Sequence, residues 1–117
     1  MNKTTRVHAG QFNRIGEFFD YPDVPDGYGG TVPGPRALLL RTKVGVTPLS
    51  GQPTFHALEI GMTNPYEVVM RTRAGFEPTV KQEIEIDGNK YSIKKIVDVN
   101  YRQRVAILWA DRFSDSV

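Results

Sequence analysis

The chain has 117 residues, of which 39% are hydrophobic and 24% charged, and its net charge is +2. This composition is typical of a folded globular protein and excludes a disordered chain, which would have few apolar residues and many charges. The length predicts a single domain spanning residues 1–117. The small positive charge is far below that of a dedicated nucleic-acid binder, so we expect any DNA contact to be local and non-specific.

The chain contains no cysteine, which excludes a disulfide framework and a thiolate metal site. Residues 1–6 are polar and no apolar run follows them. Nowhere do 18 apolar residues occur together, so we expect no signal peptide and no membrane span. These features favour an intracellular site of assembly.

Residues 6–12 alternate weakly and predict a short first strand. Residues 13–35 carry four prolines and several glycines, which interrupt strands and helices, so the sequence predicts a long mobile loop there. A loop of this length is usually disordered or functional. It also carries four aromatic residues that a purely solvated linker would rarely have: Phe18, Phe19, Tyr21 and Tyr28.

Strict alternation over residues 36–47 predicts a strand. One face carries Leu38, Leu40, Thr42, Val44 and Val46. A short helix is expected at residues 53–58, capped by Ser50, with proline in its first turn. So short a helix is unstable alone, and we expect Phe55 and Leu58 to pack on the sheet.

Three further segments predict strands with one apolar face. Residues 66–73 place Val68, Met70 and Thr72 inward, and residues 80–87 place Val80, Ile84 and Ile86 inward. Asp87-Gly88 then predicts a hairpin turn. The return strand has apolar residues on one face at Tyr91, Ile93, Val97 and Val99, with Lys95 as the polar exception on that face. The last strand places Val105, Ile107 and Trp109 inward. Together these segments predict an all-β fold, a small antiparallel barrel or sandwich of five to six strands with one short helix.

No pattern indicates a catalytic, metal or cofactor site. His8 and His56 are 48 residues apart and neither has a partner at metal-ligand spacing. Asp20, Asp23 and Asp26 lack the alternating spacing of an EF-hand and are expected to be solvated. The glycine-rich residues 27–30 precede no helix, and no serine lies in a nucleophile-elbow motif.

Basic residues lie on the outward faces of two strands that could be neighbours. They are Arg41, Lys43, Arg71 and Arg73, with Arg102 and Arg104 in a later turn that could lie nearby. One interpretation is a solvated face that discourages edge pairing. The other is a contact surface for DNA phosphates or for an acidic partner.

In this strand order, residues 7–112 resemble the phage head–tail joining family, the small head-closure or stopper proteins of tailed bacteriophages. The resemblance rests on Asp26-Gly27-Tyr28-Gly29-Gly30, on Pro48-Leu49-Ser50-Gly51 followed by Phe55 and Ala57, on Val69-Met70-Arg71, on residues 86–93 around the hairpin, and on Val97-Asp98-Val99. One departure is Pro53, which stands where the family commonly has an acidic residue.

The resemblance implies a virion structural protein without enzymatic activity or cofactor. It implies a six-fold ring between the portal or its adaptor on the head side and the tail or a tail-completion protein on the other, assembled in the host cytoplasm. Such a ring retains packaged double-stranded DNA through a loop that constricts the channel, here residues 13–35 or residues 48–62. Candidate interface residues are Phe18, Phe19, Tyr21, Tyr28, Gly29, Gly30, Pro48, Leu49 and Ser50, because aromatic side chains carry much of the energy of interfaces.

Two alternatives remain at this point. A tail-completion or tail-terminator protein is also a small β fold that forms rings. A nucleic-acid-binding β-barrel is the alternative from a different class, because Tyr66, Tyr91, Tyr101 and Trp109 could stack on bases.

Overall fold

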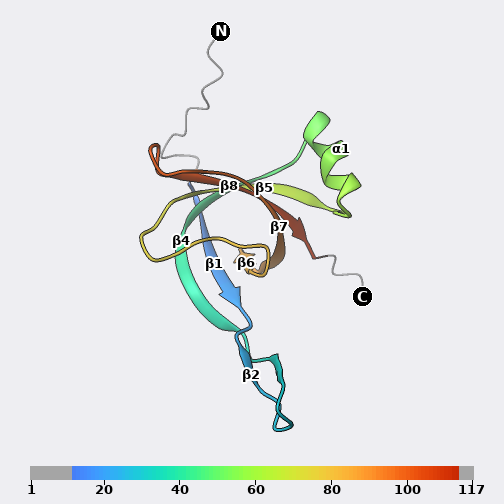
Figure 1. Cartoon of the computed structure of the whole chain (residues 1–117). Helices are drawn as coiled ribbons and strands as arrows, with labels where there is room; N and C mark the ends of the chain where they lie inside the picture. The colour runs from blue at the N-terminus through green and yellow to red at the C-terminus, as the bar shows by residue number, and fades with distance from the viewer. Residues whose placement is uncertain (1–11, 114–117) are drawn as a thin grey trace.

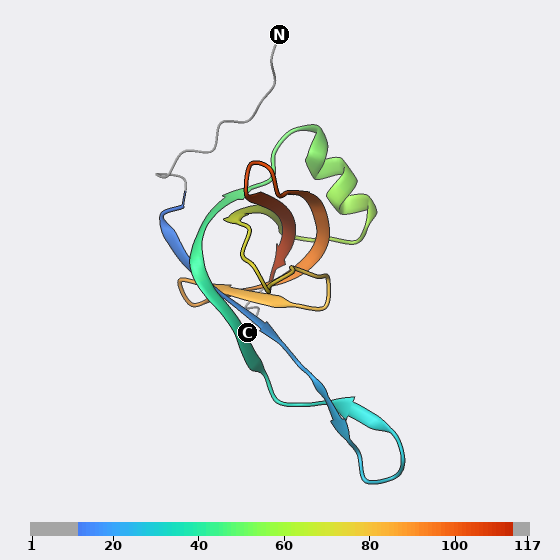
Figure 2. The same ribbon diagram turned by 60° about the vertical axis from the view of Figure 1, so that its left-hand side comes forward.

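Six antiparallel strands close into a barrel in the order β1-β4-β5-β8-β7-β6, with β6 pairing back to β1 (Figures 1 and 2). The structure is a computed structural model and describes residues 12–113. The elements are β1 Arg14–Asp20, β2 Asp23–Pro25, β3 Thr31–Pro33, β4 Ala37–Pro48, α1 Gln52–Glu59, β5 Pro65–Arg71, β6 Glu83–Ile86, β7 Asn89–Asn100 and β8 Val105–Arg112. The predicted antiparallel barrel with one short helix is therefore confirmed.

The barrel interior is filled by alternate residues of its strands, as the period of two requires. The buried set is Phe18, Val44, Val68, Met70, Ile84, Ile86, Tyr91, Ile93, Ala106, Leu108 and Ala110. Five of the predicted inward residues belong to this set: Val44, Val68, Met70, Ile84 and Ile86. Leu40 and Val46 are partly buried against it, Thr42 is buried, Thr72 is half-buried, and Leu38 and Val80 are exposed. Asp87-Gly88 forms the predicted turn between β6 and β7, and both residues have positive φ, which a tight hairpin turn requires.

The prediction of an irregular loop at residues 13–35 is wrong for β1. This strand pairs with β4 on one side and β6 on the other, and so closes the barrel. Its sequence signal is weak because Gly16 stands at an inward position. A Cβ there would lie 3.0 Å from a methyl group of Val44, so the close approach of the two strands requires glycine. The predicted strand at residues 6–12 lies outside the described residues except for Phe12, which is not in a strand.

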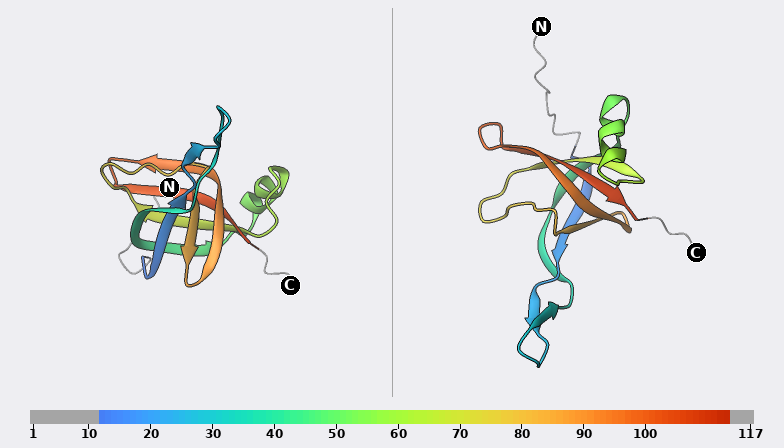
Figure 3. Two further views of the ribbon diagram at one scale, coloured as in Figure 1. Left: turned by 90° about the horizontal axis from the view of Figure 1, so that it is seen from below. Right: turned by 45° about the vertical axis from the view of Figure 1, so that its right-hand side comes forward.

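The rest of the predicted loop is a two-stranded hairpin that projects from the barrel (Figure 3). Strands β2 and β3 pair from Asp23 with Pro33 to Pro25 with Thr31. The hairpin continues the β1 and β4 pair beyond the barrel wall, after an irregularity in register between Phe18 and Phe19. Its prolines do not abolish pairing because a two-stranded ribbon has only edges, where a missing N–H is tolerated.

Helix α1 covers the outside of the barrel through a small apolar cluster of its own. Ala57 and Met62 are buried against Trp109 of β8, and Leu49 packs at the margin. The expectation that Phe55 and Leu58 pack on the sheet is wrong, since they are 68% and 51% exposed. The predicted Ser50 cap is also wrong: the N-cap residue is Gly51, without a side-chain cap hydrogen bond.

The predicted inward face of β8 is inverted. Ala106, Leu108 and Ala110 face the barrel interior, whereas Trp109 lies on the outer side under α1. Both faces of β8 are therefore buried, and alternation alone could not tell them apart.

Two register shifts in β7 change which of its residues point inward. They occur between Ile93 and Lys95 and between Ile96 and Asp98. As a result Ile96 packs against the core and Val97 is exposed, contrary to the uninterrupted phase that the sequence predicts. Lys95 is no inward exception, because its ammonium lies 5.0 Å from the centre of the Trp109 ring on the outer surface.

Residues 72–82 connect β5 to β6 and pack against the barrel core through Phe76. Phe76 packs edge-on against Phe18, with ring centres 5.1 Å apart. The buried Gln82 side chain donates to the Glu77 carbonyl and accepts from the Thr79 amide. These bonds satisfy both ends of its amide, so the connection is fixed against the core.

Replacing Trp109 with alanine is expected to lower the free energy of unfolding by about 3–5 kcal/mol, because it empties the site under α1. Phe55→Ser is the matched control on the same helix and should change stability by less than about 0.5 kcal/mol. Urea unfolding of both variants measures the difference. Equal losses would contradict the packing of α1 through Ala57 and Met62.

The buried phenol of Tyr91 should make the free energy of unfolding fall at alkaline pH. Its burial raises the pKa of the phenol above the usual 10.0, because the ionised form would lose hydration. As the pH rises past 10, Tyr91 therefore ionises in the unfolded chain before it ionises in the folded one, which favours unfolding. The stability that the neutral phenol contributes is fully present below pH 10 and is lost as the pH rises through the folded-state pKa. Between pH 9 and 11 the unfolding free energy of the native chain should fall more than that of Tyr91→Phe. Parallel curves would refute this.

Candidate functional site

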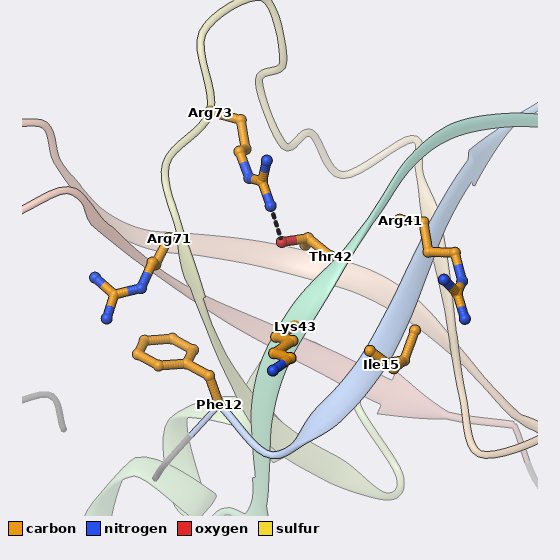
Figure 4. A pocket seen from close by; sticks show the side chains of 7 residues that line it. All are labelled: Phe12, Ile15, Arg41, Thr42, Lys43, Arg71 and Arg73. Carbon is orange, nitrogen blue, oxygen red and sulfur yellow. Dashed lines mark hydrogen bonds between the residues drawn. The ribbon is translucent and has the colours of Figure 1, made fainter. Parts of the chain in front are cut away.

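A basic pocket of about 420 Å³ lies at the start of β1, over β4 and the end of β5 (Figure 4). It is lined by Phe12, Ile15, Arg41, Thr42, Lys43, Arg71 and Arg73. The strand pairing explains the clustering, because Ile15 is opposite Lys43 in the β1 and β4 pair and Val44 is opposite Met70 in the β4 and β5 pair. The structure thus brings together all four cations that the sequence analysis singled out.

The side chains of the pocket are held by specific contacts. Arg73 donates to the Thr42 hydroxyl at 2.9 Å, as the dashed line in Figure 4 shows. The Arg71 guanidinium lies 4.9 Å from the centre of the Phe12 ring. Arg41 has an ion pair with Glu17 at 3.7 Å. The result is a hollow lined by four cations together with Thr42, the exposed Ile15 and the largely buried Phe12, and its lining contains no acidic residue.

A second hollow adjoins the basic pocket and shares Arg73 with it. Its other lining residues are Thr72, Ala74, Tyr101 and Arg104. Arg104 lies in the turn between β7 and β8 and lines this hollow together with Arg73. The expected proximity of Arg104 to the basic strand residues is therefore correct, and the cationic surface continues from the basic pocket into this turn.

The tip of the hairpin is an ordered turn that presents one tyrosine. The carboxylate of Asp26 accepts hydrogen bonds from the amides of Tyr28 at 2.7 Å and Gly30 at 3.1 Å. The Asp26 amide donates to the Gly30 carbonyl at 3.1 Å and closes the turn. Tyr28 itself is 93% exposed. Asp26 is thus a structural residue of the turn and not only a solvated acid.

The candidate interface residues of β1 and its continuation fall into different environments. Phe18 is fully buried in the barrel core, which corrects its assignment as an interface residue. Phe19 is half-buried beneath the guanidinium of Arg36, 3.6 Å from the ring centre. Tyr21 donates to Glu83 at 3.0 Å, and this hydrogen bond raises the pKa of its phenol. Tyr28 therefore remains the freely presented aromatic of the four.

The second candidate segment, residues 48–50, precedes α1. Pro48 and Ser50 are exposed, but Leu49 packs against the Trp109 cluster. The structure leaves three apolar residues of this region more than half exposed: Phe55 and Leu58, three residues apart on α1, and Ile60 at its C-cap. Phe55 and Leu58 were expected to be buried, so the sequence analysis did not identify them as an exposed apolar surface.

Residues 12–113 offer no candidate metal site and no candidate membrane-spanning helix. No group of three or more histidine, aspartate or glutamate residues there could hold a metal ion. His56 lies 3.4 Å from Glu59 on the exposed helix, and His8 lies outside the described residues. No helix in that part of the chain has the length and apolar character needed to cross a bilayer.

The aromatic residues that could stack on bases do not form an exposed platform. Tyr91 and Trp109 are buried, and Tyr66 is half-buried with its ring edge-on to that of Tyr91. Tyr101 is 66% exposed, but it lies in the turn after β7 and not on a sheet face. The surface that single-strand binding would require is therefore missing from these four residues.

Comparison with known families decides the class of this barrel. The family described as phage head completion protein matches residues 7–112. The chain belongs to this family. The match confirms the resemblance to phage head–tail joining proteins, and it implies a structural component of the virion. None of the curated proteins matches the sequence.

The barrel also has a counterpart among solved structures. The solution structure of protein SF1141 from Shigella flexneri 2a superposes with a TM-score of 0.68. The similarity covers 94% of this chain and 100% of that one, at 10% sequence identity. At so low an identity the similarity supports the fold of this head completion chain and nothing about its partners.

Asp26 provides a test of the ordered tip. Asp26→Ala removes the acceptor of two amide hydrogen bonds, so the amides of Tyr28 and Gly30 should exchange with solvent about 5- to 10-fold faster, as loss of roughly 1 kcal/mol would give. Asp26→Asn retains an acceptor oxygen and should stay near the native rate. Hydrogen exchange followed by NMR measures both. Identical exchange in the alanine variant would show that the carboxylate does not order the turn.

Proposed function

We propose that this chain forms a ring at the head–tail junction of a phage virion, closes the portal channel over packaged DNA and provides the docking site for the tail. The single observation that carries the proposal is the ordered hairpin with Tyr28 at its tip, projecting from a rigid barrel (Figure 3). An aromatic side chain held in water at 93% exposure gains nothing in the isolated chain. Such residues contribute strongly when a partner buries them.

The arrangement of exposed surfaces suits a component with neighbours on more than one side. The hairpin leaves one end of the barrel, whereas α1 with its apolar face lies near the other (Figures 1 and 3). Within residues 12–113, no layer covers Phe55 and Leu58 on α1 or Ile60 at its C-cap, and all three are exposed. We assign the hairpin to contacts within the ring or with the channel, and the helix face to the portal, its adaptor or the tail.

No reaction is part of this proposal, and no cofactor is required. A closure role needs a stiff scaffold and preformed contact surfaces. The closed barrel supplies the first because every strand in it has two neighbours. The head–tail junction is then the site of the mature protein, with the host cytoplasm as its site of assembly.

The test is DNA retention in tail-less heads assembled with and without the chain. Heads with the native chain should protect their DNA from nuclease, and heads without it should leak. Replacing residues 26–30 with Asn-Gly should abolish protection, because it removes Tyr28 but leaves a two-residue turn that joins β2 to β3 in register. Equal protection in heads lacking the chain would refute the closure role.

The matched control is a change on α1. Phe55→Ser with Leu58→Ser should leave the barrel folded and DNA retained, but reduce the fraction of heads that gain tails. Deleting residues 48–62 would not serve, because it would uncover Trp109. Binding of the chain to isolated tails but not to heads would instead favour a tail-completion protein.

A further inference from the structure

We propose that the hairpin tip of one subunit docks into the basic pocket of a second copy of this chain, so that the ring is held by head-to-tail contacts. The inference deepens the proposed function, on which it rests, by naming the two surfaces that meet. It concerns the tip residues 20–35 and the pocket lined by Phe12, Ile15, Lys43 and Arg71 with two neighbouring arginines.

The charges of the two surfaces are complementary. Residues 20–35 contain Asp20, Asp23 and Asp26 and no basic residue. The pocket carries Arg41, Lys43, Arg71 and Arg73 and no acidic residue in its lining. The overall charge of the chain is only +2, so this separation is a property of the surface and not of the composition. Opposed potentials of this kind orient partners and fix their register.

The apolar parts of the two surfaces also match. Tyr28 is 93% exposed at the tip, and Val32 on the same hairpin is 44% exposed. In the pocket the exposed apolar surface is that of Ile15, which is 37% exposed, because the Phe12 ring is 5% exposed. A DNA phosphate would use the cations but not the Ile15 side chain. An aromatic side chain beside carboxylates would use both, so an acidic, tyrosine-bearing segment fits the pocket better than DNA does.

A subunit cannot fill its own pocket with its own tip. The pocket lies at the Arg14 end of β1, and the hairpin begins beyond its Asp20 end. The strand between Ile15 and Asp20 alone spans about 17 Å at the usual rise per residue, and the hairpin extends away from it (Figures 1 and 2). The tip must therefore meet the pocket of another copy.

Contact through side chains, and not through added strands, follows from the hairpin's sequence. Pro25 and Pro33 lie in β2 and β3 and lack the N–H groups with which an edge strand would recruit a further strand. Two different patches that meet form a heterologous interface. Interfaces of that type generate a closed ring when the rotation between subunits closes.

The absence of native cysteine allows a clean cross-linking test. One chain carries Tyr28→Cys and a size tag, the other carries Ile15→Cys, and a short bis-maleimide linker joins those that meet. We expect the mixed product to exceed that of a control pair, Tyr28→Cys with Ser50→Cys, by about fivefold, as the contribution of a few exposed charge pairs would give. No excess over the control would overturn the proposal.

Charge reversal then tests the complementarity. Lys43→Glu on the Ile15→Cys chain should lower the mixed product several-fold, and Asp23→Lys on the Tyr28→Cys chain should restore it. Asp26 is left intact because it orders the turn. Failure of the second change to restore the product would overturn the pairing of tip and pocket. Loss of the cross-link between the Tyr28→Cys and Ile15→Cys chains on adding duplex DNA would assign the pocket to DNA and would also overturn the proposal.

This experiment uses purified chain and needs neither heads nor tails. A failure here would leave DNA retention intact and move the ring contact to another surface. A failure of DNA retention with a successful cross-link would leave the contact between copies but remove its assigned role. The two outcomes are therefore distinguishable.

Discussion

The whole structure depends on the seam where β1 joins β4 to β6. Without β1 the other five strands would form an open sheet with two unpaired edges, and β6 would have one neighbour. The seam closes because Gly16 allows β1 to approach Val44 and Ile84 without a side chain between them. Phe18 then enters the barrel two residues later, where it is fully buried against the capping Phe76. One missing side chain therefore permits both closure and the filling of the core.

Closure also decides where the functional surfaces lie. The pairing of β1 with β4 continues to Asp20 and Ala37 and leads directly into the projecting hairpin at one end. At the other end the same two strands, with β5, hold the cations of the basic pocket. An acidic tip and a basic pocket thus stand at opposite ends of one continuous strand pair. An element with two different ends suits a subunit that contacts its neighbours head to tail around a ring.

The outer layer under α1 illustrates a different physical rule. Trp109 is apolar and large, and its burial needs a cover that the barrel interior does not supply. The helix provides that cover with the small side chain of Ala57, which allows close approach, and with the flexible Met62. The larger Phe55 and Leu58 are left outside. These exposed residues give the head completion chain a second apolar surface, remote from the hairpin.

The sequence by itself determined the fold class, most strand positions, the hairpin at Asp87-Gly88 and the family to which the chain belongs. Alternation with period two is a local signal, and it is strong wherever one face of a strand is buried and the other is wet, as in β4 and β5. The sequence also identified Tyr28 and the four cations as candidates for contacts. What it could not supply was the environment of each residue.

Only the tertiary structure decided which face of β8 points inward, because α1 buries the outer face as well and removes the contrast that alternation needs. It also decided the phase of β7, where two register shifts move Ile96 inward and Val97 outward. It revealed β1, whose glycine hides the pattern, and it separated the buried Phe18 from the exposed Tyr28. Each of these depends on contacts between segments distant in the chain, and a local sequence pattern carries no information about them.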